Sequence, residues 1–164
     1  MTGLRRMRWW DVEPVAALER ELFPHDAWSV EQLWGELAQV PDTRWYAVHE
    51  DDVGVDGYVG LYAVPPEGDV QTIAVAPRSQ GRGLGRELLA ALVAEARLRG
   101  CAQLFLEVLD GNAAALSLYV SAGFERMGRR TSYYGPGLDA VVLRLRLHEQ
   151  ADPDPDAVPT EVRS

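Results

Sequence analysis

Apolar and polar residues alternate along the chain with two different periods, and each period predicts a different kind of element. An apolar stripe at helical spacing covers residues 84–99 and stops at Gly100, which predicts a long helix packed on a sheet. Two shorter helices are predicted: residues 11–22, with Asp11 as N-cap, and residues 29–39, beginning with the capping box SVEQ. Runs rich in β-branched and aromatic residues predict strands at 4–9, 43–50, 57–64 and 68–75.

The second half of the chain continues this order with a strand at 103–108, a helix at 112–121 and strands at 124–133 and 139–147. The strands between residues 43 and 75 are joined by short turns and should be antiparallel, whereas helices connect the later strands. The pattern predicts an α/β (α+β) fold whose mixed, mainly antiparallel sheet of about seven strands carries helices on both faces. A ligand is expected where the fourth and fifth strands part.

A glycine-rich turn, QGRGLGR at 80–86, joins the strand 68–75 to the helix 84–99. Its glycines let the backbone approach a ligand, while the helix start offers unpaired N–H groups and partial positive charge. Arg78, Arg82 and Arg86 are expected to add mobile positive charge, so the turn predicts a diphosphate site. The chain has no lysine, which excludes a Walker A loop, and a turn this late disfavours the dinucleotide fingerprint.

Composition narrows the class of protein. With 164 residues and 47% hydrophobic content, the chain suits one domain, and no apolar run reaches membrane-spanning length, so we expect a cytoplasmic protein. Cys101 is expected to be an inert packing residue. His25, His49 and His148 lack metal-ligand spacing, so no metal is predicted.

The net charge of −9 is uneven, because residues 148–164 form an acidic segment rich in proline and aspartate. We expect that segment to be a disordered tail, which leaves residues 1–147 as the folded domain. An acidic domain without a basic stripe argues against nucleic acid as a partner and weakly favours a cationic substrate.

A second group of residues carries candidate chemistry. Glu107 interrupts an otherwise apolar run, and a carboxylate there costs free energy unless it is solvated, paired or useful. Asn112 is an N-cap residue, and Tyr119 lies two turns further along the same helix face, so both can point toward one cleft. The alternatives are an edge-strand Glu107 facing water and a core Tyr119 with its hydroxyl at the rim.

These motifs resemble one enzyme superfamily. The turn Gln80-x-x-Gly83-x-Gly85 resembles the acetyl-CoA pyrophosphate loop of the GNAT N-acetyltransferases. Similarity to bacterial ribosomal-protein alanine N-acetyltransferases of the RimI type is narrower and rests on FPHDAWS at 23–29, LEV at 106–108, NAA at 112–114, LY at 118–119, AGF at 122–124 and RRTSYY at 129–134. Together they cover residues 4–147, although LDG at 109–111 and GPG at 135–137 depart from the pattern and leave specificity open.

The resemblance implies roles for particular residues. Glu107 would accept a proton from the incoming amine, directly or through water, and Tyr119 would protonate the leaving CoA thiolate. The implied cofactor-binding residues are Ile73, Ala74, Val75, Gly81, Arg82, Gly83, Leu84, Gly85, Arg86 and Asn112. The aromatic residues Trp28, Tyr133 and Tyr134 are expected to hold an extended acceptor peptide.

The implied activity is acetyl-CoA-dependent acetylation of the N-terminal alanine of a ribosomal protein, by direct transfer in a ternary complex. The sequence leaves the oligomeric state open, and a monomer is favoured. Two alternatives remain open at this point. The acceptor could be a small-molecule amine or a broader set of protein N-termini, or the chain could be a non-catalytic acyl-CoA-binding partner protein. The presence of both Glu107 and Tyr119 argues against the second alternative.

Overall fold

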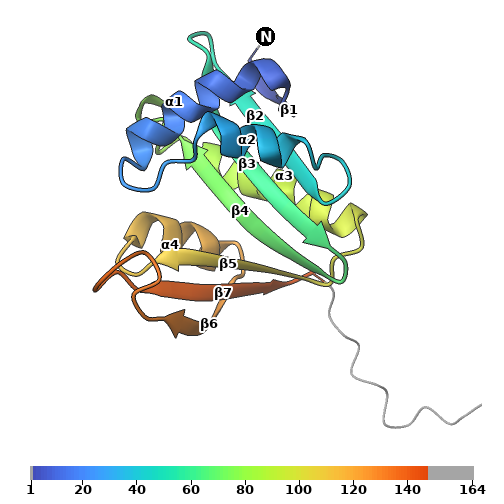
Figure 1. Cartoon of the computed structure of the whole chain (residues 1–164). Coiled ribbons are helices and arrows are strands. Elements are labelled where there is room, and N and C mark those ends of the chain that lie inside the picture. Colours follow the sequence, from blue (N-terminus) through green and yellow to red (C-terminus); the bar gives the residue numbers. More distant parts are fainter. Residues whose placement is uncertain (1, 148–164) are drawn as a thin grey trace, which may run out of the picture.

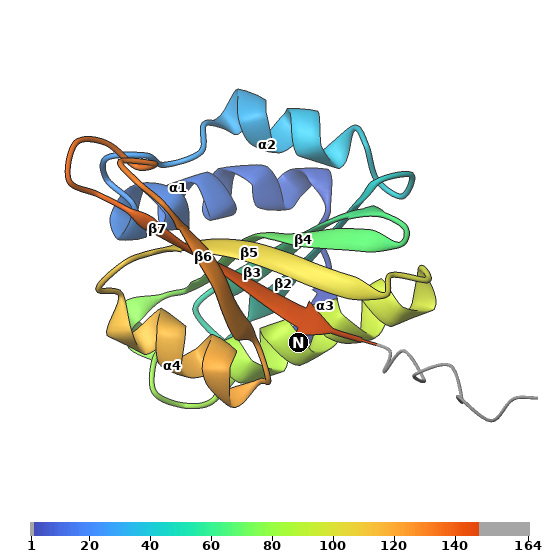
Figure 2. The ribbon, with the colours of Figure 1, turned by 90° about the horizontal axis from the view of Figure 1, so that it is seen from below.

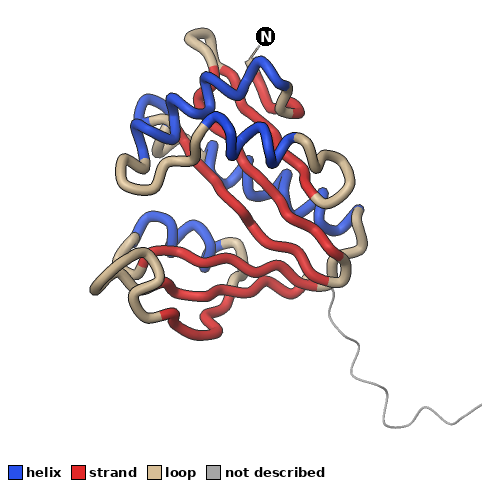
Figure 3. The backbone as a smooth tube through the Cα atoms, in the orientation of Figure 1, coloured by secondary structure: helices blue, strands red, loops and turns tan. Residues whose placement is uncertain are grey.

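The computed structural model describes residues 2–147 as one sheet with flanking helices (Figures 1 and 3). The 3₁₀ turns Trp9–Asp11 and Pro77–Ser79 precede α1 and the glycine-rich turn. The elements are β1 (Gly3–Arg6), α1 (Val12–Leu22), α2 (Val30–Leu37), β2 (Arg44–Glu50), β3 (Val55–Val64), β4 (Glu67–Val75), α3 (Leu84–Leu98), β5 (Gln103–Leu109), α4 (Ala113–Ser121), β6 (Glu125–Arg130) and β7 (Ala140–Arg146).

The seven described strands form a single sheet in the order β1-β2-β3-β4-β5-β7-β6. Every neighbouring pair is antiparallel except β4 and β5, so the predicted mixed, mainly antiparallel sheet is confirmed. β4 and β5 pair over three residues only, ending where Asp69 lies opposite Phe105, and then diverge (Figure 1). The sheet is therefore split at the carboxyl ends of these two strands, as the sequence predicted.

Helices cover both faces of the sheet, with α1 and α2 on one face and α3 and α4 on the other (Figure 2). The predicted stripe of α3 is buried, with Leu88, Leu92 and Ala96 fully inaccessible to solvent. These residues share a core with the side chains of β5 that point to the same face, such as Leu104. Tyr58 belongs to the second core, beneath α1 and α2.

Local signals explain where the first helices begin. The predicted capping box is present: the backbone N–H of Gln32 donates to Ser29 Oγ at 3.1 Å, and Ser29 N–H donates to Gln32 Oε1 at 2.8 Å. Asp11 occupies the N-cap of α1, as predicted, but its side chain makes no capping hydrogen bond to that helix. Its carboxylate instead accepts two hydrogen bonds from the Arg5 guanidinium, at 2.7 and 2.8 Å, because a bidentate charged pair outcompetes a single cap.

The predicted acidic tail, residues 148–164, lies outside the described residues, and the division at residue 147 stays a prediction. Within residues 2–147, none of the helices combines the length and apolar character needed to cross a membrane. Cys101 is fully buried, as expected for a packing residue, and burial raises the pKa of its thiol.

Candidate active site

The glycine-rich turn has the geometry of an anion cradle. Gly81 and Gly83 have φ of 75° and 84°, in the left-handed region, and a Cβ added at either would meet no atom within 4 Å. In the described part of the chain, no backbone amide from residue 81 to residue 86 donates a hydrogen bond of ordinary geometry. These free N–H groups surround open space at the start of α3, where the helix dipole adds positive charge, so the turn fits a diphosphate.

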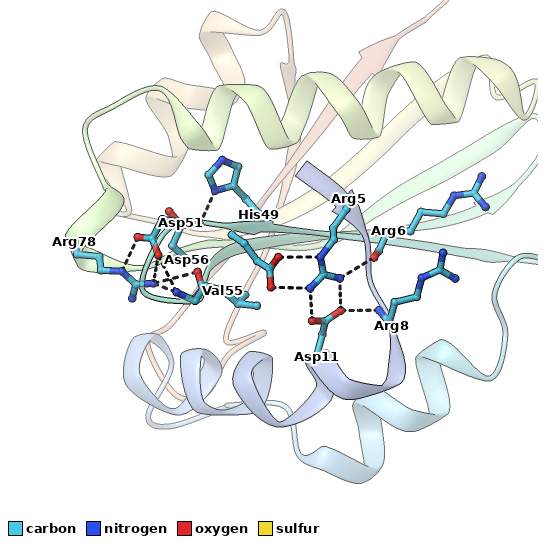
Figure 4. A network of polar contacts seen from close by, with 11 residues as sticks. Arg5, Arg6, Arg8, Asp11, His49, Asp51, Val55, Asp56 and Arg78 are labelled. Carbon is cyan, nitrogen blue, oxygen red and sulfur yellow. Dashed lines mark hydrogen bonds and ion pairs between the residues drawn. The ribbon is translucent and has the colours of Figure 1, made fainter. Parts of the chain in front are cut away.

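The arginines around this turn do not all behave as predicted. Arg82 and Arg86 are exposed and free to reach an anion. Arg78 is not mobile, because it donates to both carboxylate oxygens of Asp51, at 2.9 and 3.1 Å (Figure 4). It also reaches the carbonyls of Gly54 and Val55, so Arg78 fastens the turn to the β2–β3 connection.

A second acidic residue holds the segment that leads into the glycine turn. The buried carboxylate of Asp56 accepts a hydrogen bond from Ser79 Oγ at 2.6 Å. Its other oxygen lies 2.5 Å from His49 Nδ1 (Figure 4). Ala76 N–H donates to the Asp56 carbonyl at 2.7 Å. The turn is thus anchored on one side and open on the other.

A cavity of about 400 Å³ lies between the glycine turn and α4, and we call it the loop–α4 cavity. Three of the predicted cofactor-binding residues, Gly83, Gly85 and Arg86, line it. The opposite wall was not predicted from the sequence and consists of Ala114, Ser117, Leu118 and Ser121. Small side chains dominate that wall, which leaves room for a chain-like ligand beside the turn.

The other predicted cofactor-binding residues do not line the loop–α4 cavity. Ala74 and Leu84 are buried in the cores on opposite faces of the sheet. Ile73 and Val75 lie at the end of β4, where the Val75 carbonyl accepts a hydrogen bond from Gln80 Nε2 at 3.0 Å. Asn112 caps α4, its Oδ1 accepting from Ala115 N–H at 3.2 Å.

A second cavity, of about 510 Å³, lies at the split between β4 and β5, and we call it the aromatic cavity. It brings together Glu107 and all three predicted acceptor-binding residues, which are far apart in the chain. Its lining is Trp28, Asp69, Val70, Gln71, Phe105, Leu106, Glu107, Arg130, Tyr133 and Tyr134.

The two cavities are reached from opposite faces of the sheet. The loop–α4 cavity is lined by residues of the glycine turn, α3 and α4, which lie on one face of the sheet, whereas Trp28 packs against the core beneath α1 and α2 on the other face. Leu104 and Leu106 point into the α3 core, so Glu107 points to the other face by strand alternation. A group that passes from one cavity to the other must cross the split between β4 and β5.

Glu107 is held by residues of the β6–β7 connection. Its side chain is 29% exposed, and Oε1 lies 3.2 Å from Arg130 Nε. The Tyr134 hydroxyl donates to the Glu107 carbonyl at 3.2 Å. The pKa of Tyr133 is raised mainly by its interaction with the Glu107 carboxylate and, to a smaller extent, by burial. In the sheet order β5 lies between β4 and β7, but at Glu107 it pairs only with β7, because its pairing with β4 ends at Phe105.

Trp28 is fixed by a buried carboxylate beneath it. Glu19, on α1, is 2% exposed and accepts hydrogen bonds from Trp28 N–H at 3.2 Å and from the Tyr58 hydroxyl. Thr72 Oγ1 donates in turn to the Tyr58 hydroxyl at 3.1 Å. Burial raises the pKa of Glu19, and the hydrogen bond from Tyr58 opposes that shift. The loop that carries Trp28 is therefore tied to β3 and β4.

Tyr119 is 6% exposed and lines neither cavity. Its ring packs edge-on against Phe124, with ring centroids 5.7 Å apart. Burial raises the pKa of its hydroxyl well above the ordinary value, and the nearby Tyr134 raises it further. Tyr119 is thus part of the buried core on the α3–α4 face of the sheet.

Asp69, Gln71, Phe105 and Arg130 were missed as residues of the aromatic cavity. They come from three strands, and only the register of β4 with β5 and the return of β6 bring them together. Arg130 carried one signal in the sequence, its place in the RRTSYY segment. Among the described residues, no group of three potential metal ligands is present.

The fold and site define an acetyltransferase. The model of the acetyltransferase (GNAT) family matches residues 4–124, and the chain belongs to that family. It is 40% identical over 139 residues to the N-alpha-acetyltransferase RimI of Mycobacterium tuberculosis, covering 82% of this chain and 85% of that protein. A Bacillus subtilis protein, provisionally named a ribosomal protein bS18-alanine N-acetyltransferase, is 30% identical over 148 residues, covering 90% and 97%.

An uncharacterised Mycobacterium leprae protein is 41% identical over 138 residues, but this chain spans only 38% of its length. Among solved structures, the ribosomal-protein-S18-alanine N-acetyltransferase of Escherichia coli gives a TM-score of 0.80 at 27% identity, covering 93% of this chain and 98% of that one. The Salmonella typhimurium protein yncA, solved with its cofactor acetyl-CoA, shares the fold with a TM-score of 0.79 at 24% identity, covering 94% and 98%. The protein is therefore an N-acetyltransferase.

Proposed function

We propose that this N-acetyltransferase transfers the acetyl group of acetyl-CoA to the α-amino group of a protein, with the N-terminal alanine of a ribosomal protein as the leading acceptor. The observation that carries the proposal is Glu107, whose carboxylate faces an aromatic cavity at the split of the sheet. The aromatic cavity on one face of the sheet suits an acceptor peptide, and the glycine turn on the other face suits a diphosphate. The two substrates would meet at the split between β4 and β5.

The donor would be held mainly by backbone groups, with a few side chains beside them. The free amides of residues 81–86 and the exposed Arg82 and Arg86 would hold the diphosphate of acetyl-CoA. Ile73, Ala74 and Val75, at the open end of β4, would pair with the pantetheine arm, and Leu84 and Asn112 would contribute beside them. The names of the relatives and the fit of the turn support this assignment.

Transfer would be direct, with both substrates bound at once. The neutral α-nitrogen attacks the thioester carbonyl, the C–N bond forms and the C–S bond breaks. Glu107 would take the proton released by the nitrogen, directly or through water, and Tyr119 would give its hydroxyl proton to the leaving thiolate. The raised pKa of Tyr119 keeps that proton in place at neutral pH, as a general acid requires.

The α-amino group is favoured as acceptor by its own chemistry. Only a neutral amine attacks a thioester, and an α-amino group has a pKa of about 7.7–8.0, against about 10.4 for lysine. That gap of roughly 2.5 units corresponds to about 3.4 kcal/mol in favour of the N-terminus at neutral pH. Trp28, Tyr133 and Tyr134 would hold the residues that follow it.

A comparison of two peptides tests the proposal. One begins with Ala-Arg and contains no lysine, and the other has the same sequence with a blocked N-terminus and one lysine. We expect kcat/KM at least about tenfold higher for the free N-terminus, a margin well within the pKa advantage. Mass spectrometry of the products locates the acetyl group. Preferential acetylation of lysine, spermidine or an aminoglycoside would overturn the peptide reading, and no transfer to any amine would favour a non-catalytic acyl-CoA-binding protein.

A further inference from the structure

One negative charge in the aromatic cavity has no partner. Three charged side chains line the cavity: Asp69, Glu107 and Arg130. Arg130 lies 3.2 Å from Glu107 and compensates that carboxylate. The backbone of Asp69 pairs with β3 and β5, but within residues 2–147 its carboxylate makes no hydrogen bond or ion pair. The lining therefore carries one net negative charge, which belongs to Asp69.

Asp69 stands at the branch point of the sheet. It is the last residue of β4 that pairs with β5, opposite Phe105, and the strands diverge beyond it. Glu107 follows Phe105 by two residues and so points to the same face. The strand spacing and two residues of rise put the backbones of Asp69 and Glu107 about 8 Å apart. An extended peptide whose α-nitrogen lies at Glu107 has its next side chain within reach of Asp69.

The surroundings of Asp69 favour a cation. Burial raises the pKa of this carboxyl, and the nearby Glu107 and Glu67 raise it further. Arg44 acts in the opposite direction, but its guanidinium is bound to Glu36 at 2.5 Å. A positively charged group brought to Asp69 therefore meets an uncompensated carboxylate in a partly desolvated site.

We propose that Asp69 binds the basic side chain of the acceptor's second residue and so selects protein N-termini with arginine or lysine at that position. The proposal rests on the proposed function, because it takes the α-nitrogen to lie at Glu107. It assigns a separate task to each carboxylate: Glu107 handles the proton of the reacting nitrogen, and Asp69 reads the neighbouring residue.

Two peptides that differ only at the second residue, Ala-Arg and Ala-Gln, followed by the same neutral sequence, test this assignment. For the wild type we expect kcat/KM about tenfold higher with arginine, mostly through a lower KM, and the advantage should shrink at high salt. Asp69→Asn should bring the two peptides within about twofold of each other, with the larger loss of kcat/KM falling on the Ala-Arg peptide. Asp69→Ser provides a second uncharged variant.

Glu67→Gln is the matched control, because it removes the same charge two residues earlier on the same strand, outside the cavity. It should keep the tenfold ratio, and all variants should bind acetyl-CoA as the wild type does. If Asp69→Asn left the ratio of kcat/KM between the two peptides unchanged, the proposal would be overturned. An equal loss of kcat/KM with both peptides would also overturn it, because it would place Asp69 at the α-ammonium group itself. A wild type that acetylates neither peptide would instead overturn the proposed function and this inference together.

Discussion

The two cavities on either side of the split sheet are built in different ways. The loop–α4 cavity depends on one continuous turn, whose glycines expose backbone amides, and on one helix with small side chains. The aromatic cavity is assembled from the α1–α2 loop, β4, β5, β6 and the connection to β7, each giving one or a few side chains. Under the proposed function, the donor would be bound mainly by backbone groups of one local segment, and the acceptor by side chains from several distant segments.

This difference separates what substitutions on each side should do. Changes in the aromatic cavity should alter turnover or the acceptor's KM while acetyl-CoA still binds. Changes in the glycine turn should alter acetyl-CoA binding first. A substitution in the aromatic cavity that weakened acetyl-CoA binding, or one in the glycine turn that left it unchanged, would contradict this separation.

The largest effect is expected at Glu107. Glu107→Gln keeps the size of the side chain but removes the proton acceptor, so kcat should fall roughly 10²–10⁴-fold. Calorimetry should give an acetyl-CoA dissociation constant within about twofold of wild type. Glu125→Gln, on the exposed strand β6, is the control and should leave both quantities unchanged. Near-normal turnover in Glu107→Gln across the pH range would assign this carboxylate a structural role.

A smaller effect is expected at Tyr119. Tyr119→Phe keeps the contact with Phe124 but removes the proton donor, and kcat should fall about 10²-fold. Because its raised pKa keeps the hydroxyl protonated, the wild type should show no loss of kcat from this group as pH rises to 10. A loss between pH 8 and 10 that disappears in Tyr119→Phe would contradict this account. Tyr62→Phe, outside both cavities, serves as the control.

The effect of Gly83→Asp should be confined to the donor side. The new side chain places negative charge in the cradle, so the acetyl-CoA dissociation constant should rise at least about tenfold, or about 1.4 kcal/mol. Gly100 has a similar φ of 86° at the far end of α3, and Gly100→Asp therefore carries the same backbone strain without touching the cradle. Equal affinities in the two variants would show that the turn does not hold the diphosphate.

The sequence predicted the parts of the molecule whose signals are local. The stripe of α3, the Ser29 capping box and the glycine turn each depend on residues within a few positions of one another, and each is present. The fixed position of Arg78 was missed because Asp51, its partner, lies 27 residues away across a hairpin. Asp69 was missed for the same reason, since only strand pairing brings it beside Glu107.

Trp28, Tyr133 and Tyr134 were predicted as one group, and they do meet in one cavity. That success came from the resemblance of their segments to a family and not from spacing, because the loop and the β6–β7 connection are about one hundred residues apart. The role of Glu19 beneath Trp28 had no sequence signal, because a buried glutamate on a helix is recognised only once its partners are known.

The central claim is that one substrate on each face meets the other through the split between β4 and β5. A bisubstrate analogue, with CoA joined through an acetyl linker to the α-nitrogen of an Ala-Arg peptide, tests it by calorimetry. We expect it to bind at least about 100-fold more tightly than acetyl-CoA, because the second contact becomes intramolecular. Trp28→Ala should remove most of that gain and leave acetyl-CoA affinity unchanged. An analogue that binds no more tightly than acetyl-CoA would contradict the claim.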